Sequence, residues 1–347
     1  MFFASDNAGR VHPKVMEALV EANEGFAQPY GADPIMQDVR AKLRDIFEAP
    51  QAAVYLVATG TAANSIALAT IGQPWQTVFC SPVAHIQEDE CNAPEFYSGG
   101  AKLTLVGDGD KMTAPALHAA IGREETRGVH GAQRGPVSVT QVTERGSVYS
   151  LDEIKALCDV AKSFDVPVHL DGARFANAQV ALGCSAADMT WKAGVDVVSF
   201  GGTKNGLMGV EAVILFDPSK AWEFELRRKR GAHLFSKHRY LSVQMAAYLR
   251  DDLWLDSART ANANCARLAN GLADAGAHLL YEPQANMIFA DFPRAAHQRL
   301  HEAGAVYYVW EGQLDGEDPQ ELLTARLVCD WSITHDQIDQ FVEILKG

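Results

Sequence analysis

VDVVSFGGTKNGLMGVEAV, which runs from Val195 to Val213, places a single lysine among glycines at the end of an apolar run. The crowded valines and Phe200 are typical of a buried β-strand, and the glycine-rich turn that follows ends it. Open α/β sheets bind their ligands where strands end at such turns. Lys204 is therefore either a solvated lysine of a surface loop or a buried lysine that loses its proton easily, a property that suits Schiff-base chemistry.

Apolar runs alternate with helical patterns on both sides of this stretch, from about residue 13 to about residue 216. Such alternation predicts an α/β fold with a mainly parallel sheet that helices cover on both faces. The expected strands are AAVYLVA, TVFC, KLTLV, PVSVTQV, VPVHLD, VDVVSF and EAVILF, and the expected helices include PIMQDVRAKLRDIFEA, GTAANSIALATIG and LDEIKALCDVAKSF.

The pattern changes after Lys220. AWEFELRRKR, LSVQMAAYLRDDLW and ARTANANCARLANGLADAG predict long helices. NMIFADF, AVYYVW and ELLTARLVCDW then predict strands of a smaller α/β unit, which the helix ITHDQIDQFVEILKG closes. We therefore expect a large domain over residues 1–250 and a small C-terminal domain over residues 251–347.

Composition restricts the class of protein. The chain has 347 residues and a net charge of −14, which argues against non-specific binding to nucleic acid or to anionic membranes. Its six cysteines form no CxxC pair, as is typical of a reducing compartment. The N-terminus lacks signal-peptide features, and no apolar run is long enough to span a membrane. We expect a cytoplasmic protein.

The common motifs of other enzyme classes are missing from the sequence. There is no P-loop, HExxH or GxSxG, GDGDKM lacks the third glycine of a dinucleotide fingerprint, and the histidines show no metal-ligand spacing. One segment does complement Lys204. VPVHLD ends at Asp171, and a carboxylate at a strand end can pair with the protonated ring nitrogen of pyridoxal phosphate. Taken alone, Asp171 is more readily explained as a turn residue or a helix cap before GARFA.

A third segment offers a place for a phosphate. AVYLVATGTAANSIAL puts Thr59, Gly60 and Thr61 between a strand and a helix. Backbone N–H groups at a helix start, together with threonine hydroxyls, suit a phosphate group. An ordinary glycine turn with a threonine cap is the alternative, but the three segments together predict a pyridoxal phosphate site.

The sequence resembles the low-specificity L-threonine aldolases, which depend on pyridoxal phosphate and have the aspartate aminotransferase fold (fold type I). The resemblance covers nearly the whole chain, in FASDNAGRVHP, PYGAD, TGTAANSIAL, SPVAHIQEDECNAPEF, VSVTQVTERGSVYS, HLDGARFANA, SFGGTKNG and TARLVCDWSIT. It implies a lyase that cleaves L-threonine, L-allo-threonine or related β-hydroxy amino acids to glycine and an aldehyde such as acetaldehyde.

The resemblance also implies roles for individual residues. Lys204 is expected to hold pyridoxal phosphate covalently, Asp171 to bind its ring nitrogen, and His85 of SPVAHIQEDE to stack on its ring. Arg174 of HLDGAR and Arg326 of TARLV are expected to bind the substrate carboxylate, which a guanidinium grips through two bonds.

Four more residues receive roles in the same way. His130 of RGVHGAQRG matches a second active-site histidine that acts on the substrate hydroxyl, although a surface histidine is the alternative. Ser5 and Tyr30 are expected to line the mouth of the substrate cavity. Lys237 of LFSKHRY, in the only basic cluster of the chain, is expected to reach the cofactor phosphate of a neighbouring subunit, with a solvated helix end as the alternative. The resemblance further implies a dimer with shared sites, usually within a homotetramer.

Several related functions stay open at this point. An aldolase for phenylserine is one, with Trp310, Trp331 and Tyr307 shaping its pocket. A serine hydroxymethyltransferase-like enzyme, a β-eliminating lyase and an aminotransferase are others of the same fold. A catalytically silent binding or regulatory module of this fold is a different class of function, and the intact Lys204, Asp171 and Arg174 weigh against it.

Overall fold

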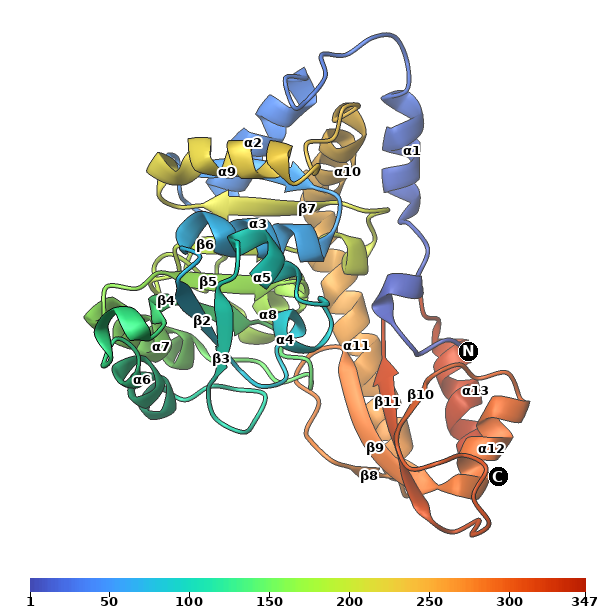
Figure 1. Ribbon diagram of the computed structural model, residues 1–347. Coiled ribbons are helices and arrows are strands. Elements are labelled where there is room, and N and C mark those ends of the chain that lie inside the picture. The colour runs from blue at the N-terminus through green and yellow to red at the C-terminus, as the bar shows by residue number, and fades with distance from the viewer.

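The larger of two β-sheets has seven strands in the order β1-β7-β6-β5-β4-β2-β3 (Figure 1), in a computed structural model that describes residues 1–347. β7 runs antiparallel to both of its neighbours, and the other four pairs are parallel. The mainly parallel α/β sheet that the sequence predicts is confirmed. Its strands are β1 (Ala53–Val57), β2 (Gln76–Cys80), β3 (Lys102–Leu105), β4 (Gln133–Thr140), β5 (Val168–Gly172), β6 (Val197–Phe200) and β7 (Glu211–Leu215).

Helices cover both faces of this sheet, because its central strands are apolar at successive positions. In β7, Val213 and Leu215 pack with α3 (Gly60–Ile71), whereas Ala212 and Ile214 belong to the larger core on the opposite face. The face of α3 also carries α4 (His85–Glu88), α5 (Ala93–Ser98) and α9 (Ala221–Arg230). The larger core takes up α1 (Pro13–Glu21), α2 (Pro34–Ile46), α6 (Ala114–Arg123), α7 (Leu151–Ser163), α8 (Phe175–Leu182) and α10 (Arg239–Leu249).

One predicted helix is interrupted. LSVQMAAYLRDDLW is expected as a single helical stretch, but α10 ends at Leu249 and α11 (Leu253–Asp274) begins after a short turn. Asp251 and Asp252 in this turn have φ angles of 51° and 55°. The helical periodicity predicted the apolar faces correctly but missed this break, because aspartate tolerates the left-handed conformation better than most residues.

The second sheet has the order β10-β11-β9-β8, and all of its pairs are antiparallel. Its core also includes Phe3, and Phe3 N donates to Val306 O, so the start of the chain packs on this second unit. The division of the chain into domains at residues 1–250 and 251–347 remains a prediction. The elements are β8 (His278–Leu279), β9 (Met287–Pro293), α12 (Arg294–Glu302), β10 (Tyr308–Glu311), β11 (Leu322–Val328) and α13 (His335–Lys346), and α11 packs on them.

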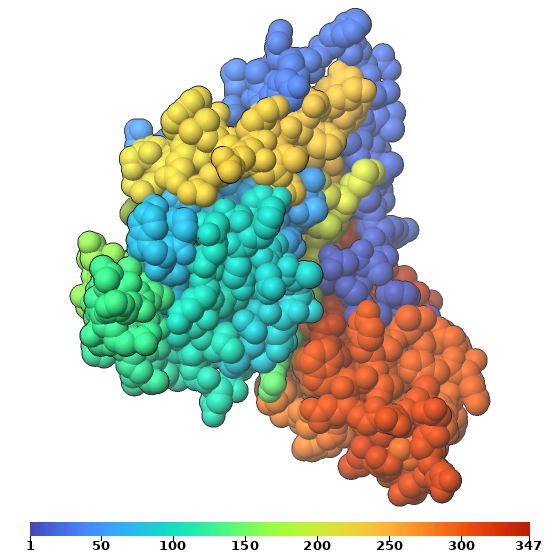
Figure 2. Space-filling model, in the orientation of Figure 1, coloured from blue at the N-terminus to red at the C-terminus, as the bar shows by residue number.

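The two sheets lie in two lobes of the molecular surface. Figure 2 shows the second unit as a lobe of its own in orange and red, with the N-terminal segment in blue lying against it. None of the helices is both long enough and apolar enough to cross a membrane.

Candidate active site

The central parallel strands bring two of the predicted residues to one edge of the larger sheet. Asp171 lies at the carboxyl end of β5, where it pairs with Thr140 of β4 and Ser199 of β6. Lys204 follows the end of β6 in a short 3-10 turn. Backbone segments approach closely here, because a Cβ on Gly201 would lie 2.3 Å from Ala173 O. The glycines before Lys204 therefore let the two strand ends meet.

Buried polar groups hold the turn that carries Lys204. Gly202 N donates to Glu211 Oε2 at 2.6 Å. On the other side of Lys204 in the sequence, Asn205 Nδ2 donates to Tyr248 Oη at 2.7 Å and to Trp254 O at 2.8 Å. Burial raises the pKa of Glu211 to about 7, although the nearby Lys204 lowers it. Lys204 therefore lies in a turn that buried hydrogen bonds hold in place, rather than in a free surface loop.

Asp171 is part of a buried hydrogen-bonded chain. Its Oδ1 accepts from Ala173 N at 3.1 Å and its Oδ2 from Asn64 Nδ2 at 2.9 Å. Asn64 Nδ2 also donates to Glu90 Oε1 at 2.9 Å, and Glu90 Oε1 lies 2.8 Å from His85 Nδ1. His85, at the first position of α4, is therefore tied to Asp171 through two side chains.

The electrostatic surroundings favour protonation of His85. Burial lowers the pKa of its imidazole, but the hydrogen bond to Glu90 and the charges of Asp171 and Glu144 outweigh burial, so that the pKa lies above its usual value. Burial raises the pKa of Glu90, and the neighbouring Asp171 adds to this effect. The histidine and its acid partner thus both have pKa values above those of the free groups.

The predicted phosphate site is the N-terminus of α3. Thr59 is the N-cap, and its Oγ1 accepts from Ala62 N at 3.2 Å, so this hydroxyl caps the helix. The N–H groups of Gly60 and Thr61 belong to the first turn, where a helix provides no partner. An added Cβ on Gly60 would meet no atom within 4 Å. Open space therefore adjoins a helix terminus that favours anions.

Two arginines with unpartnered donors face a common region. Arg174 is held by Asp6, with Nε–Oδ2 and Nη2–Oδ1 distances of 2.7 and 2.9 Å, and both side chains are buried. Arg326 of β11 has its Nη2 3.4 Å from Met287 Sδ. Arg174 Nη1 and Arg326 Nε are buried without a hydrogen-bond partner. Such groups are costly unless a ligand satisfies them, and two guanidinium donors suit a carboxylate.

The charges of the two arginines act on each other. Burial lowers the pKa of Arg326, and the positive charge of Arg174 lowers it further. Glu144 and Asp6 oppose this effect. The two guanidinium groups therefore lie within electrostatic reach, although Arg174 is the N-cap of α8 and Arg326 lies in β11 of the second sheet. Ser5 lies beside this group, since its Oγ caps the turn that contains Asp6.

Tyr30 and Lys237 form a separate cluster. Tyr30 N donates to Ser236 O at 3.1 Å, and Lys229 Nζ lies 5.3 Å from the centre of the Tyr30 ring. Lys237 is exposed in the turn before α10. No hydrogen bond or ion pair within the chain joins either residue to Lys204 or Asp171. The structure thus brings Tyr30 and the loop of Lys237 together, but not to the strand ends.

His130 lies at the other edge of the sheet. It ends a short 3-10 turn before β4, is exposed, and makes no side-chain hydrogen bond within the chain. β4 has eight residues and its last one pairs with Asp171. At a rise of about 3.3 Å per residue, more than about 20 Å separates the two edges. The structure therefore contradicts the placement of His130 in this site and favours the surface histidine.

Glu144 lies at the edge of the sheet where His130 was expected. It follows β4 in a loop at the same edge as Asp171, and its charge acts on His85, Arg174 and Arg326. Glu144 was not among the residues predicted from the sequence, although TERG directly follows the predicted strand PVSVTQV. The rule that singled out Asp171, a carboxylate at the end of a buried strand, would have found Glu144 as well.

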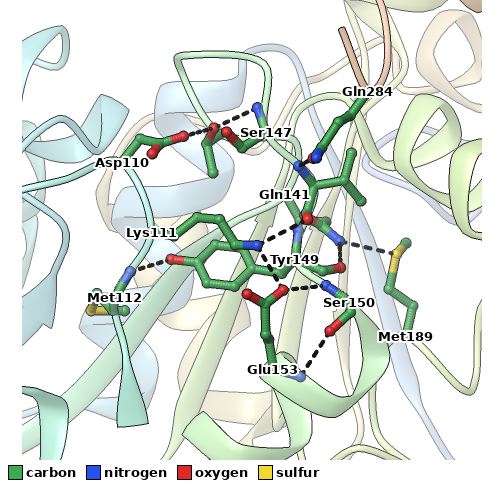
Figure 3. A network of polar contacts seen from close by, with 12 residues as sticks. Asp110, Lys111, Met112, Gln141, Ser147, Tyr149, Ser150, Glu153, Met189 and Gln284 are labelled. Atoms are coloured by element: carbon green, nitrogen blue, oxygen red, sulfur yellow. Dashed lines mark hydrogen bonds and ion pairs between the residues drawn. The ribbon is translucent and has the colours of Figure 1, made fainter. Parts of the chain in front are cut away.

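Hydrogen bonds on both sides of Glu144 hold the loop after β4 in place (Figure 3). Gln141 and Tyr149 exchange two hydrogen bonds of 2.9 Å, and Tyr149 Oη accepts from Met112 N at 2.6 Å. Val148 N donates at 2.6 Å to Oε1 of Gln284, which lies between β8 and β9 of the second sheet. The loop of Glu144 is therefore anchored to both units of the chain.

The aromatic residues proposed for a phenylserine pocket are dispersed. Trp310 is half-exposed, and Arg326 lies 5.8 Å from the centre of its ring. Trp331 packs on His12. Tyr307 is buried in the core of the second unit and bonds His297, so its assignment to a pocket is wrong. An alternating strand pattern does not show which of its aromatic side chains face inward.

Comparisons with known proteins define the class to which this site belongs. The beta-eliminating lyase family matches residues 3–295, so the chain belongs to this family. A structure of SPT with PLP has the same fold, with a TM-score of 0.69, 17% identity, and coverage of 100% of this chain and 86% of the other. The fold is therefore that of the fold type I enzymes, whose cofactor is pyridoxal phosphate.

One sequence relative and one solved structure identify the branch of the family to which the chain belongs. Low specificity L-threonine aldolase from Pseudomonas sp. (strain NCIMB 10558) is 39% identical over 349 residues, 99% of this chain and 97% of the relative. The threonine aldolase structure from Leishmania major has a TM-score of 0.92 and 25% identity, with coverage of 99% of this chain and 98% of that one. The chain is a member of the low-specificity L-threonine aldolases.

Proposed function

We propose that the chain is a pyridoxal phosphate-dependent aldolase that cleaves L-threonine and L-allo-threonine to glycine and acetaldehyde. Two buried arginines with unpartnered N–H groups carry this proposal, because they offer a carboxylate site beside the strand ends of Lys204 and Asp171. An α-amino acid substrate presents such a carboxylate. The similarity to threonine aldolases supports the choice of β-hydroxy amino acids among the possible substrates.

The residues at the strand ends fit pyridoxal phosphate. Asp171 is a buried carboxylate suited to a ring N–H, Lys204 offers an amine on a rigid turn, and the open N-terminus of α3 suits a phosphate at Gly60 and Thr61. His85 is expected to stack on the ring. When bound, the cofactor withdraws electrons from the reacting carbon of the amino acid.

Residues of the chain would then decide which bond breaks. Arg174 and Arg326 fix the substrate carboxylate, with Ser5 beside them, and orientation selects the bond between Cα and Cβ. Cleavage also requires a group that accepts the proton of the β-hydroxyl. His85 and Glu144 are the titratable groups at this edge, and His130 is too distant to serve within the same chain.

We further propose that the active site is completed by a neighbouring subunit. Lys237 lies exposed next to Tyr30 and away from the strand ends of its own chain. Large apolar side chains are exposed on the same segments, namely Phe26, Leu226 and Phe235. Exposed apolar groups that gather in this way mark interaction surfaces. A dimer, paired into a tetramer, would cover them and bring Lys237 to the partner's phosphate site.

A cytoplasmic location is part of the proposal. It rests on the cysteine pattern, since all six cysteines are free thiols and four of them are buried. Free thiols persist in reducing compartments.

An assay of products tests the proposed reaction. Purified enzyme supplied with pyridoxal phosphate and L-threonine, L-allo-threonine or phenylserine should release glycine and the matching aldehyde without any keto acid. Phenylserine belongs in the panel because Trp310 lies beside Arg326. Amino transfer to a keto acid, with no aldehyde formed, would falsify the aldolase assignment and favour an aminotransferase.

A further inference from the structure

Two buried side chains, Glu90 and Asn64, connect His85 to Asp171, and neither is among the residues proposed to bind the cofactor or the substrate. Three contacts of 2.8 to 2.9 Å run from His85 through Glu90 and Asn64 to Asp171. The side chain of Glu90 is fully buried, and Asn64 is 2% exposed. Burying a carboxylate and an amide is unfavourable, and these contacts offset part of that cost, although Asn64 Oδ1 and Glu90 Oε2 are buried without a partner.

The amide of Asn64 can be oriented in only one way. Its Nδ2 lies 2.9 Å from an oxygen of Glu90 and 2.9 Å from an oxygen of Asp171. An amide turned the other way would place its own oxygen between two carboxylate oxygens, and three acceptors would then face one another. Asn64 therefore donates one N–H to each acid, and both acids accept at these atoms.

This arrangement determines the proton position on His85. Glu90 Oε1 already accepts from Asn64, and as an ionised carboxylate oxygen it accepts from His85 Nδ1 as well. Nδ1 therefore carries a hydrogen in the neutral imidazole, and Nε2 does not. Nε2 makes no hydrogen bond within the chain, and the side chain is 28% exposed. The unprotonated nitrogen is thus the one left free for a ligand.

We propose that Glu90 and Asn64 are positioning residues that make Nε2 of His85 the proton acceptor of the active site and that hold the carboxylate of Asp171 in place. The proposal deepens the proposed function and rests on it. Glu90 acts through His85, and Asn64 acts on both ends of the chain. Neither needs to touch the substrate.

The charges around His85 agree with this role. The carboxylates of Glu90, Asp171 and Glu144 face it, and their influence exceeds the effect of burial on its pKa. Loss of the negative charge at Glu90 should therefore make the imidazole a weaker base, while the neutral amide of glutamine still accepts from Nδ1. Loss of Asn64 should instead affect both His85 and Asp171, because the two carboxylates lose their common donor.

The test compares Glu90→Gln, Asn64→Ala and the control Asn264→Ala in the full chain. Asn264 is also a buried asparagine with two hydrogen bonds, but these go to Asp330 O and Ile333 O in another region. Carbethoxylation of His85 is followed against pH by peptide mass spectrometry after removal of the cofactor. The midpoint should fall by about one pH unit in Glu90→Gln and stay unchanged in Asn264→Ala.

A second measurement separates the two positioning residues. Retention of pyridoxal phosphate, followed by absorbance during dialysis, should stay normal in Glu90→Gln and weaken in Asn64→Ala, where Asp171 loses its side-chain donor and keeps only Ala173 N. With threonine, Glu90→Gln should lower kcat more than it raises KM, and the pH at half-maximal rate should shift in the same direction as the modification midpoint.

Three outcomes would overturn the inference. An unchanged His85 midpoint in Glu90→Gln removes the link between Glu90 and the histidine. Normal cofactor retention in Asn64→Ala, equal to that of Asn264→Ala, removes the link to Asp171. A change of kcat without a change of the midpoint gives Glu90 a different role. Chemical modification does not depend on the reaction catalysed, so it also distinguishes failure of this inference from failure of the proposed function.

Discussion

Asp6 and Arg174 form a buried ion pair with two hydrogen bonds, although 168 positions separate them in the sequence. Asn286 Nδ2 adds a third bond to the same carboxylate at 3.1 Å. Burial alone would raise the pKa of Asp6, but Arg174 and Lys204 reverse the shift and lower it. The arginine is thus held in one orientation by an ionised partner before any substrate carboxylate arrives.

Replacement of Asp6 by alanine should destabilise the fold and weaken substrate binding. Arg174 would remain as an unpaired buried charge, which lowers the free energy of unfolding by about 3 kcal/mol. KM for threonine should rise more than kcat falls, because the guanidinium loses its fixed orientation. Urea unfolding and steady-state kinetics measure both effects. Asp256→Ala is the control, since it removes an exposed ion pair with Arg259 and should cost less than about 1 kcal/mol. Equal behaviour of the two variants would contradict the assigned role.

Glu211 should give the stability a distinctive pH dependence. Its pKa is raised in the fold from 4.5 to about 7, mainly by burial. The stability is therefore complete below the unfolded pKa and declines as the pH rises from about 4.5 through about 7, by up to about 3 kcal/mol. Glu211→Gln retains an acceptor for Gly202 N and should abolish this part of the pH dependence. Parallel urea curves at pH 5 and pH 8 for both proteins provide the comparison, and an identical difference in the two would exclude Glu211 as its source.

Glu144 and His130 should respond oppositely to substitution. Glu144→Gln removes a charge at the carboxyl end of β4 and should lower kcat by about tenfold or more. His130→Ala changes an exposed residue at the other edge of the sheet and should leave both kcat and KM as in the unchanged enzyme. Steady-state kinetics with threonine measure kcat and KM of both variants. A large loss with His130→Ala would mean that this residue acts in a neighbouring subunit.

Lys204 should be the residue that holds the cofactor. Purified protein is expected to be yellow, and borohydride should fix pyridoxal phosphate covalently to the peptide that contains Lys204. Lys204→Ala should yield no such adduct. Peptide mass spectrometry identifies the labelled residue, and a label on another lysine contradicts the proposed site.

Hybrid dimers test the proposed contribution of Lys237. Lys204→Ala and Lys237→Ala should each have little activity when alone. If Lys237 acts across the interface, then a hybrid of the two chains contains one site with both lysines, and mixing should restore part of the activity. Native mass spectrometry confirms that hybrids form. Hybrids without recovered activity would favour the solvated helix end.

Local sequence patterns were sufficient to predict those candidate site residues that lie at the ends of single strands. Lys204 and Asp171 each follow an apolar run that can only be a covered strand, and both lie at the predicted edge. Glu144 obeys the same rule and was predictable. His130 was misplaced because the likeness of a short motif was preferred over its position before a strand, which in a parallel sheet is the opposite edge.

Contacts across long sequence separations could not be predicted in this way. Asp6 meets Arg174 only because the start of the chain packs between the two sheets, and Asn64 meets Asp171 over 107 positions. Neither pair leaves a periodicity in the sequence. The break between α10 and α11 was missed for a different reason, since the left-handed backbone of Asp251 and Asp252 is a conformation that aspartate tolerates and that apolar periodicity does not reveal.

The first residues of the chain tie the two sheets together. Phe3 is buried in the second core, and Asp6, three positions later, is bound to Arg174 at the edge of the larger sheet. Three residues of extended chain span at most about 11 Å. This short tether limits how far the edge of the larger sheet at Arg174 can move from the second core. The arginine proposed to bind the substrate carboxylate therefore lies beside the segment that joins the two lobes.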